Sequence, residues 1–188
     1  MRDTDTEIVF LSGKRTPFGD FKGELADFTA TDLAVETGKA AIEQAGIEPD
    51  DVDHVIYGNV VQSSKDAAYL ARHAGLRCDI PQKVPALTLN RLCGSGFQSL
   101  ISGAEQLLLG EGDFILAGGT ESMTQVPYVI RGARTGVGLG ANPASDFLWE
   151  SLTDAYAEMP MGMTAEKLAR KYDVTRQEWQ RSDPEAGT

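Results

Sequence analysis

The sequence predicts an α/β protein whose mostly parallel sheet is covered by helices on both faces. Short apolar runs bounded by glycine or proline alternate with segments of helical period over residues 1–119. Their order is strand, helix, strand, helix, strand, helix, strand, which is typical of parallel sheets. The last strand, helix and strand follow one another within about thirty residues, so they predict a right-handed βαβ unit.

The first strand and the first helix are expected near the beginning of the chain. Residues 7–11 form the apolar run Glu-Ile-Val-Phe-Leu and predict a strand, and a turn-rich loop follows. Thr29 and Asp32 resemble a capping box that begins a helix, and Gly46 is expected to end it. The inward face of this helix is predicted to carry Leu33, Ala34, Ala41, Ile42 and Ala45.

Two more strands flank a short helix in the next part of the chain. Residues 54–58 and 83–89 predict the strands, and residues 66–74 predict a helix that Gly75 closes. His54 and His73 lie in no motif, so a structural role is expected for both.

The best-defined helix begins after Cys93 and is expected to end at Gly110. Residues 113–119 then predict a short buried strand. Apolar residues recur along the helix at the spacing of a single stripe: Phe97, Leu100, Ile101, Ala104, Leu107 and Leu108.

Cys93 is the candidate catalytic residue, because it stands where a strand gives way to this helix. Unpaired N–H groups and the macrodipole at a helix start favour an anion, and the thiolate is the reactive form of cysteine. Gly94 and Gly96 would leave room for a substrate carbonyl beside the sulfur. The alternative is a small buried cysteine, with glycines that serve close packing of the helix on the sheet.

The remainder of the chain differs in composition and has little periodicity. Residues 120–163 are rich in Gly, Pro, Met and Thr, and we place a domain boundary between residues 1–119 and 120–188. The glycine-rich run 132–140 lacks the context of a nucleotide-binding loop, so a flexible loop is expected. Thr164 is predicted to cap a helix whose inward face carries Ala165, Leu168, Ala169 and Tyr172. A second helix, capped at Thr175, is expected to end at Asp183-Pro184.

Composition limits the classes of function. The chain has no apolar run of membrane-spanning length and no visible secretory signal, so we expect that it neither binds membranes nor is secreted, and its low cysteine content indicates a reducing, cytoplasmic setting. Cys78 and Cys93 are the only cysteines, which suggests neither a disulfide framework nor a metal site. The net charge of −11 disfavours nucleic-acid binding, and the basic pair Lys14-Arg15 is expected in a solvated loop rather than at a phosphate.

Several long motifs, in order, resemble the signature segments of thiolases, the acetyl-CoA acyltransferases and acetyltransferases. The resemblance covers about residues 6–178 and is supported further by Arg15-Thr-Pro-Phe-Gly19 and by Gly58-Asn59-Val60. The three signature segments are Asn90-Arg-Leu-Cys93-Gly-Ser-Gly, Gly118-Gly-Thr-Glu-Ser-Met-Thr-Gln-Val-Pro-Tyr128 and Met161-Gly-Met-Thr-Ala-Glu166.

The resemblance implies a thiolase-like layered α/β fold with an inserted loop domain, which begins near residue 120. It assigns Cys93 as the nucleophile that takes the acyl group as a thioester, with its own N–H in the oxyanion hole. Leu152 and Met161 align with positions that line the substrate pocket of the loop domain, although ordinary core packing is the alternative for each. No cofactor is implied, because coenzyme A is a substrate.

The implied reaction is a ping-pong cleavage of 3-ketoacyl-CoA to acetyl-CoA and a shortened acyl-CoA. The alternative is the reverse condensation, which makes acetoacetyl-CoA. Short-chain acetoacetyl-specific thiolases typically carry His before the equivalent of Met161, whereas this chain has Pro160, so thiolysis is favoured.

The chain departs from the family in length. A full thiolase is about twice as long, and its other half carries a Gly-His-Pro motif and a second Cys in a Cys-x-Gly motif, neither of which is found here. Residues 179–188 also leave the family pattern, and the fifth strand of the first half is missing. We therefore expect either one part of an enzyme completed by another polypeptide or a non-catalytic remnant, and an isolated chain without turnover. Family members are homo-oligomers, which suggests the same for a completed enzyme.

Overall fold

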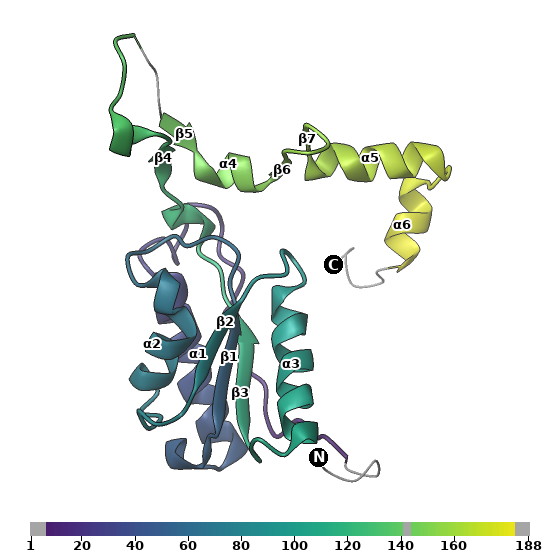
Figure 1. The fold of residues 1–188 in the computed structure, drawn as a ribbon. Coiled ribbons are helices and arrows are strands. Elements are labelled where there is room, and N and C mark those ends of the chain that lie inside the picture. Colours follow the sequence, from purple (N-terminus) through teal and green to yellow (C-terminus); the bar gives the residue numbers. More distant parts are fainter. Residues whose placement is uncertain (1–6, 141–143, 183–188) are drawn as a thin grey trace. The chain divides into compact units, whose positions relative to one another are not determined.

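A computed structural model describes residues 7–140 and 144–182 of the chain (Figure 1). Contacts divide the chain into two compact units, residues 1–126 and residues 127–188. This division falls a little after Gly119, where the sequence suggested a boundary. We describe each unit by itself.

The first unit is built on a three-stranded parallel sheet in the order β2-β1-β3. Val55 of the central strand pairs with Ala86 on one side and with Leu116 on the other. Helices α1 and α2 cover one face of the sheet and α3 covers the other (Figure 1), so the predicted fold class is confirmed. The elements are α1 Ala30–Ala45, β1 His54–Gly58, α2 Leu70–Arg77, β2 Ala86–Leu89, α3 Ser95–Leu109 and β3 Ile115–Gly119, with 3-10 turns at Pro49–Asp51, Ala67–Tyr69 and Met123–Gln125.

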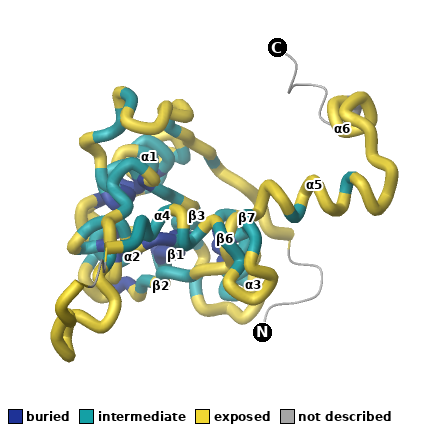
Figure 2. The backbone as a smooth tube through the Cα atoms, turned by 90° about the horizontal axis from the view of Figure 1, so that it is seen from above, coloured by how far each residue is buried: buried dark blue, intermediate teal, exposed yellow. Residues whose placement is uncertain are grey.

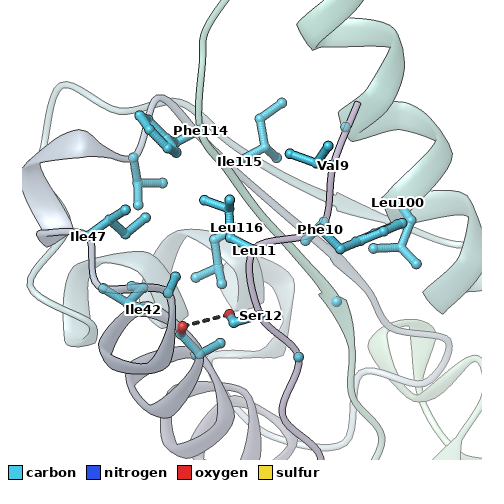
Figure 3. Close-up of a pocket in the computed structure, with 18 of the residues that line it drawn as sticks. Val9, Phe10, Leu11, Ser12, Ile42, Ile47, Leu100, Phe114, Ile115 and Leu116 are labelled. Atoms are coloured by element: carbon cyan, nitrogen blue, oxygen red, sulfur yellow. Dashed lines mark hydrogen bonds between the residues drawn. The ribbon is translucent and has the colours of Figure 1, made fainter. Parts of the chain in front are cut away.

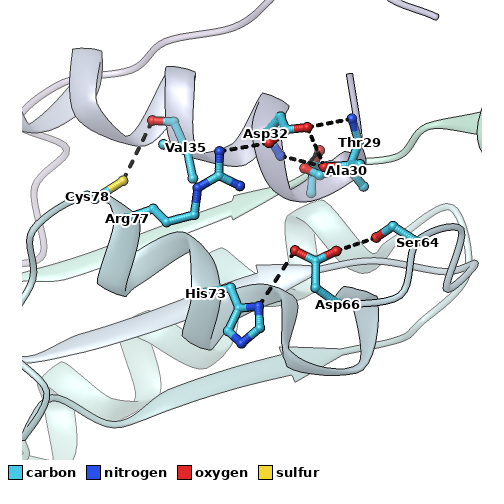
Figure 4. Close-up of polar contacts among 10 residues, drawn as sticks. Thr29, Ala30, Asp32, Val35, Ser64, Asp66, His73, Arg77 and Cys78 are labelled. Atoms are coloured by element: carbon cyan, nitrogen blue, oxygen red, sulfur yellow. Dashed lines mark hydrogen bonds and ion pairs between the residues drawn. The ribbon is translucent and has the colours of Figure 1, made fainter. Parts of the chain in front are cut away.

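The beginning of α1 is confirmed as a capping box. The Asp32 N–H donates to Thr29 Oγ1 at 3.0 Å, and the Thr29 N–H donates to Asp32 Oδ2 at 2.9 Å. Gly46 ends the helix with a φ of 68°, a left-handed conformation that glycine adopts without strain. Arg77 of α2 donates to the other Asp32 oxygen at 2.7 Å, so the same carboxylate joins α2 to α1 (Figure 4).

The core of the first unit lies between the sheet and the pair α1 and α2, where Figure 2 shows most of the buried backbone. Of the inward face predicted for α1, Ala34 and Ile42 are buried, whereas Leu33, Ala41 and Ala45 are half-buried. The largest fully buried side chains are Ile56, Leu70, Val55, Thr31, Cys78 and Ser99.

The predicted strand at residues 7–11 is wrong. This segment is irregular, and Val9 and Phe10 are 67% and 78% exposed. It lies beside β3 along an apolar cavity of about 480 Å³, with Ile42 and Leu100 on other walls (Figure 3). An apolar run becomes a strand only when a neighbouring backbone takes up its hydrogen bonds, and among the described residues β3 pairs with β1 alone.

The end predicted for the second helix is also wrong. Helix α2 continues through Gly75 to Arg77. A Cβ at Gly75 would lie 3.1 Å from Val55 Cγ2, so this glycine serves close packing of the helix on the central strand rather than termination. The third and fourth predicted strands are real but shorter, since β2 and β3 begin at Ala86 and Ile115.

Helix α3 has the predicted length but not the predicted inward face. Its buried residues are Ser95, Ser99 and Gly103, one helical turn apart, whereas Phe97 and Ile101 are 76% and 47% exposed. Small residues let the helix approach the sheet closely: a Cβ at Gly103 would lie only 3.3 Å from an Ile115 methyl group. The apolar stripe is therefore only partly covered, and Leu108 is 42% exposed as well.

The second unit contains short elements. Two antiparallel pairs, β4 with β5 and β6 with β7, are each followed by a helix. The glycine-rich run falls in the connection between β4 and β5 and includes a 3-10 turn at Ala133–Thr135. The elements are β4 Tyr128–Ile130, β5 Ala144–Asp146, α4 Phe147–Ser151, β6 Thr153–Asp154, β7 Met159–Pro160, α5 Met161–Lys171 and α6 Arg176–Ser182.

Two details of this unit correct the sequence analysis. Helix α5 begins at Met161, directly after Pro160, so Thr164 is inside it and does not cap it. The face predicted to point inward, with Leu168 and Tyr172, is not buried in the described part of the chain. The capping box at Thr175 is confirmed, since the Thr175 N–H donates to Glu178 at 2.8 Å. The predicted end at Asp183-Pro184 lies outside the described residues.

Candidate active site

Cys93 lies in a tight turn between the end of β2 and the start of α3. The Gly94 and Ser95 N–H groups donate to the carbonyls of Arg91 and Leu92, at 3.1 and 2.9 Å. The Ser95 hydroxyl accepts from the Arg91 N–H at 2.8 Å and donates to the Leu92 carbonyl at 2.6 Å. These bonds close the turn on both sides of the cysteine.

Leu92, the residue before the cysteine, has a φ of 49°. A left-handed conformation is uncommon for a residue with a branched side chain and occurs where the surroundings impose it. The Asn90 side chain helps to impose it, because its Oδ1 accepts from the Leu92 N–H at 2.9 Å. The backbone therefore turns sharply just before the sulfur-bearing residue.

The first turn of α3 is seated on glycines at the ends of two strands. A Cβ at Gly58, the last residue of β1, would lie 2.5 Å from the Ser95 backbone. A Cβ at Gly119, the last residue of β3, would lie 2.9 Å from the Gly96 Cα. Gly96 therefore serves close packing, and the helix starts directly over the carboxyl edge of the sheet, where ligands bind in proteins of this kind.

The Cys93 side chain is exposed, which excludes the alternative of a small buried cysteine. It stands two residues before Ser95, the first residue of α3. The Ser95 and Gln98 N–H groups donate to carbonyls of the turn. Within the described residues this leaves the Gly96 and Phe97 N–H groups without a partner, so the helix start keeps donors for an anion.

Cys78 is buried, whereas Cys93 is exposed. It is 2% exposed, and its thiol donates to the Val35 carbonyl at 3.6 Å (Figure 4). Burial raises the pKa of Cys78 to about 11. A neutral thiol in the core is inert, so we assign Cys78 no catalytic role.

A half-buried carboxylate joins the loop that follows β1 to the loop that follows β3. Glu121 accepts hydrogen bonds from the Val60 N–H at 2.8 Å, the Val61 N–H at 3.2 Å and the Asn59 side chain at 2.9 Å. Asn59 also donates to the Thr120 carbonyl at 3.0 Å. Burial raises the pKa of Glu121, and the hydrogen bonds from Val60, Val61 and Asn59 oppose this effect.

The turn that carries Cys93 is joined to this arrangement. Asn90 Nδ2 donates to the Val60 carbonyl at 3.2 Å. Asn59, Asn90 and Glu121 come directly or almost directly after the ends of β1, β2 and β3. Sequence reasoning placed them in motifs of the resemblance but assigned none of them a role. The signal was available, because polar residues that follow parallel strands meet at one edge of the sheet.

Leu152 and Met161, the predicted pocket residues, are neighbours in the second unit. The Met161 N–H donates to the Leu152 carbonyl at 3.0 Å, which closes the hairpin of β6 and β7. Both side chains are partly exposed, at 38% and 43%. Core packing therefore does not account for either residue among the described parts of the chain. Cys93, in contrast to these two residues, belongs to the first unit.

The remaining candidate residues show no catalytic arrangement. Arg15 lies in an exposed loop with its guanidinium 4.6 Å from the centre of the Phe18 ring. His73 stacks on Tyr69, and its Nδ1 is 3.6 Å from Asp66 (Figure 4). No group of three or more potential metal ligands occurs among the described residues. In the same part of the chain, no helix is both long and apolar enough to cross a membrane.

The fold and the site together define an α/β protein with an exposed cysteine before a helix at the carboxyl edge of a parallel sheet. A model of the thiolase N-terminal domain matches residues 8–181. The chain therefore belongs to the thiolase family, and the resemblance seen in the sequence is confirmed.

Known relatives agree with this assignment. The chain is 52% identical over 172 residues to the human mitochondrial 3-ketoacyl-CoA thiolase, a match that covers 91% of this chain and 43% of the human protein. It is 40% identical over 170 residues to a beta-ketothiolase of Cupriavidus necator, covering 90% of this chain and 43% of the relative. The chain thus spans less than half the length of the relatives it matches.

Solved structures match equally well. A crystal structure of the human mitochondrial 3-ketoacyl-CoA thiolase in complex with CoA superposes with a TM-score of 0.86 at 52% identity, covering 92% of this chain and 44% of that one. The acetyl-CoA acetyltransferase of Bacillus anthracis gives 0.86 at 38% identity, over 92% of this chain and 44% of that one.

The relatives correct one prediction. A cytoplasmic location was expected from the low cysteine content, yet the human, orangutan and rat relatives are named as mitochondrial. The cytoplasmic assignment is therefore wrong. The composition of the chain carried no information on this point.

Proposed function

We propose that this chain is the nucleophile-bearing part of a thiolase that cleaves 3-ketoacyl-CoA. The Cys93 thiolate attacks the 3-keto carbonyl, the Cα–Cβ bond breaks, and the released carbanion takes a proton to become acetyl-CoA. The acyl group remains on Cys93 as a thioester. The thiol of CoA then attacks this thioester and leaves with the shortened acyl chain, which restores the free cysteine.

The observation that carries this proposal is the position of Cys93. Its exposed side chain stands two residues before α3, where unpaired N–H groups are available to stabilise the oxyanion that forms when the sulfur attacks. A thiolase relative crystallised with CoA shares this fold over 92% of the chain, which supports CoA and acyl-CoA as the ligands. CoA acts as a substrate in this scheme, and no resident cofactor takes part.

Leu152 and Met161 are proposed to line the acyl pocket. Their half-exposed side chains flank the same hairpin, so together they offer an apolar surface of the kind that binds an acyl chain. Replacing either with Ser is expected to raise the KM for long acyl chains more than for acetoacetyl-CoA in a completed enzyme.

A further polypeptide segment is needed for turnover. Family resemblance places the activating His and the second Cys in a part that this chain does not contain, and the chain covers only 43% of its human relative. The isolated chain should therefore form an acyl-enzyme slowly and not turn over. An enzyme completed by that segment and assembled as a homo-oligomer should turn over. If no such segment exists, the chain is a non-catalytic remnant or an interaction fragment.

The reverse direction is the second candidate. Condensation of two acetyl groups would yield acetoacetyl-CoA on the same cysteine, and the match to an acetyl-CoA acetyltransferase structure at 38% identity keeps it open. Pro160 before Met161 favours thiolysis, because acetoacetyl-specific thiolases typically carry His there.

The test is a thiolysis assay of the purified chain, alone and mixed with the C-terminal part of a thiolase relative. Loss of 3-ketoacyl-CoA in the presence of CoA is expected only in the mixture, and the Cys93→Ala variant is expected to abolish it. Steady thiolysis by the chain alone would overturn the need for a second segment. Activity in the Cys93→Ala mixture would overturn the role of the cysteine.

A further inference from the structure

We propose that Glu121 is a positioning residue for Cys93, acting through the backbone of Val60 and the side chain of Asn90. This inference rests on the proposed function, since it assigns Cys93 the reacting sulfur. It adds a residue that lies in a different loop and on a different strand end from the cysteine.

The first link is the carboxylate itself. Glu121 follows β3, and its two oxygens accept from the Val60 and Val61 N–H groups at 2.8 and 3.2 Å. Two consecutive N–H groups directed at one carboxylate fix the peptide planes between them, because charge-assisted hydrogen bonds are short and directional. The Val60 carbonyl is held in place as a result.

The second link runs from that carbonyl to the turn before α3. Asn90 donates its Nδ2 to the Val60 carbonyl at 3.2 Å, and its Oδ1 accepts from the Leu92 N–H at 2.9 Å. An amide side chain has one donor side and one acceptor side, and Asn90 uses one for each loop. Its orientation therefore sets the distance between the loop after β1 and the turn before Cys93.

The third link is the backbone of Leu92. Its φ of 49° is unfavourable for leucine and needs support from its surroundings. Asn90 supplies that support on one side, and Ser95 supplies it on the other by donating its hydroxyl to the Leu92 carbonyl at 2.6 Å. If the Asn90 support is lost, Leu92 relaxes and the next residue, Cys93, turns away from the helix start.

The experiment measures the rate at which iodoacetamide alkylates each cysteine of the 188-residue chain near neutral pH, by mass spectrometry. Wild type is compared with Glu121→Gln, Asn90→Ala and the double variant. Each single variant is expected to slow Cys93 about three- to tenfold, the size of a helix-terminus effect on an anion. Cys93 of the double variant is expected to react no more slowly than Cys93 of the slower single variant, because both substitutions interrupt the same chain of hydrogen bonds.

Two controls separate positioning from loss of structure. Cys78 is buried in the core of the same unit, so its labelling should stay negligible in every variant that remains folded. Glu105→Gln removes an equal charge from the exposed side of α3 and should leave Cys93 unchanged. A circular dichroism melting curve of each variant establishes that it is folded at the labelling temperature.

Other outcomes are equally decisive. Unchanged Cys93 rates in folded Glu121→Gln, or strictly additive losses in the double variant, would overturn the positioning role. A rise in Cys78 labelling that accompanies the change at Cys93 would also overturn it, since that pattern indicates unfolding of the first unit. If wild-type Cys93 reacts no faster than the same cysteine in urea, the proposed function fails instead.

Discussion

Cys93 and Cys78 show how the same side chain takes on different chemistry within one fold. Cys93 is exposed in front of a helix, whereas Cys78 ends α2 inside the core. The residues next to each cysteine did not by themselves reveal which one is buried. The position of Cys93 between a predicted strand and a predicted helix was the informative signal.

Alkylation tests this difference. At pH 7, limited iodoacetamide should label Cys93 and spare Cys78, whose pKa is raised to about 11 by burial. Only about one Cys78 thiol in ten thousand is ionised at that pH, and the core excludes the reagent. Mass spectrometry of the two cysteine-containing peptides provides the measurement. Equal labelling of a folded sample would contradict the assignment.

Gly58 is a second residue whose role can be tested. A Cβ there would lie 2.5 Å from the Ser95 backbone, so Gly58→Ala must displace the first turn of α3. We expect a loss of about 1–3 kcal/mol in the free energy of unfolding. Gly94→Ala is the matched control: its Cβ would meet no atom nearer than the Arg91 carbonyl at 3.4 Å. Urea denaturation of both variants gives the comparison, and equal losses would argue against the close contact.

Among the elements, α1 has the start that is most clearly encoded in the sequence. The Thr29 and Asp32 pair was predicted from the sequence and is present with both of its hydrogen bonds. Hydrogen bonding to Thr29, with a smaller effect of Arg77, keeps the pKa of Asp32 below its ordinary value of 3.8, although burial opposes this. The stabilisation is therefore complete above that value and is lost as the pH falls through the pKa of the folded protein.

Thr29→Ala is expected to reduce stability by about 1 kcal/mol at pH 7. The reduction should become smaller near pH 3, because protonation of Asp32 weakens the capping box in the wild-type protein as well. Thermal unfolding of both proteins at the two pH values measures it. A larger loss of stability at pH 3 than at pH 7 would contradict the view that the ionised Asp32 carboxylate stabilises the protein through its hydrogen bonds with Thr29.

Helix α3 shows where reasoning from periodicity reached its limit. Its period and its end at Gly110 were predictable, since both depend on local sequence. Its inward face was not, because Ser99 and Gly103 pack on the sheet through their small size rather than their apolarity. Phe97 was expected inward and is 76% exposed, so Phe97→Ser should change the free energy of unfolding of this chain by less than about 0.5 kcal/mol, measured by urea denaturation.

At the scale of the whole molecule, the parallel sheet and its helices were predictable from the alternation of segments. The strand expected at residues 7–11 was not formed, because strand formation depends on a distant partner and not on the run itself. The same reasoning explains the site. Cys93 could be found from local order, whereas Glu121 and Asn90 are joined through Val60, a contact between loops far apart in the sequence.

The chain corresponds to one part of the thiolase structures that it matches. It matches thiolase structures over 92% of its length and spans 44% of theirs. In the reaction we propose, Cys93 takes the acyl group and the N–H groups at the start of α3 stabilise the oxyanion. The resemblance assigns activation of the cysteine and proton transfer to the Gly-His-Pro and Cys-x-Gly motifs, which are not found in these 188 residues.

Acyl transfer to the chain itself tests the account most directly. The purified protein is incubated with an acyl-CoA near neutral pH, quenched in acid and digested, and the acylated peptide is identified by mass spectrometry. We predict a thioester on Cys93 that hydroxylamine removes and that is absent in Cys93→Ser, with Cys78 unmodified. A folded sample in which Cys93 remains free, or in which Cys78 is acylated at the same rate, would contradict the central claim.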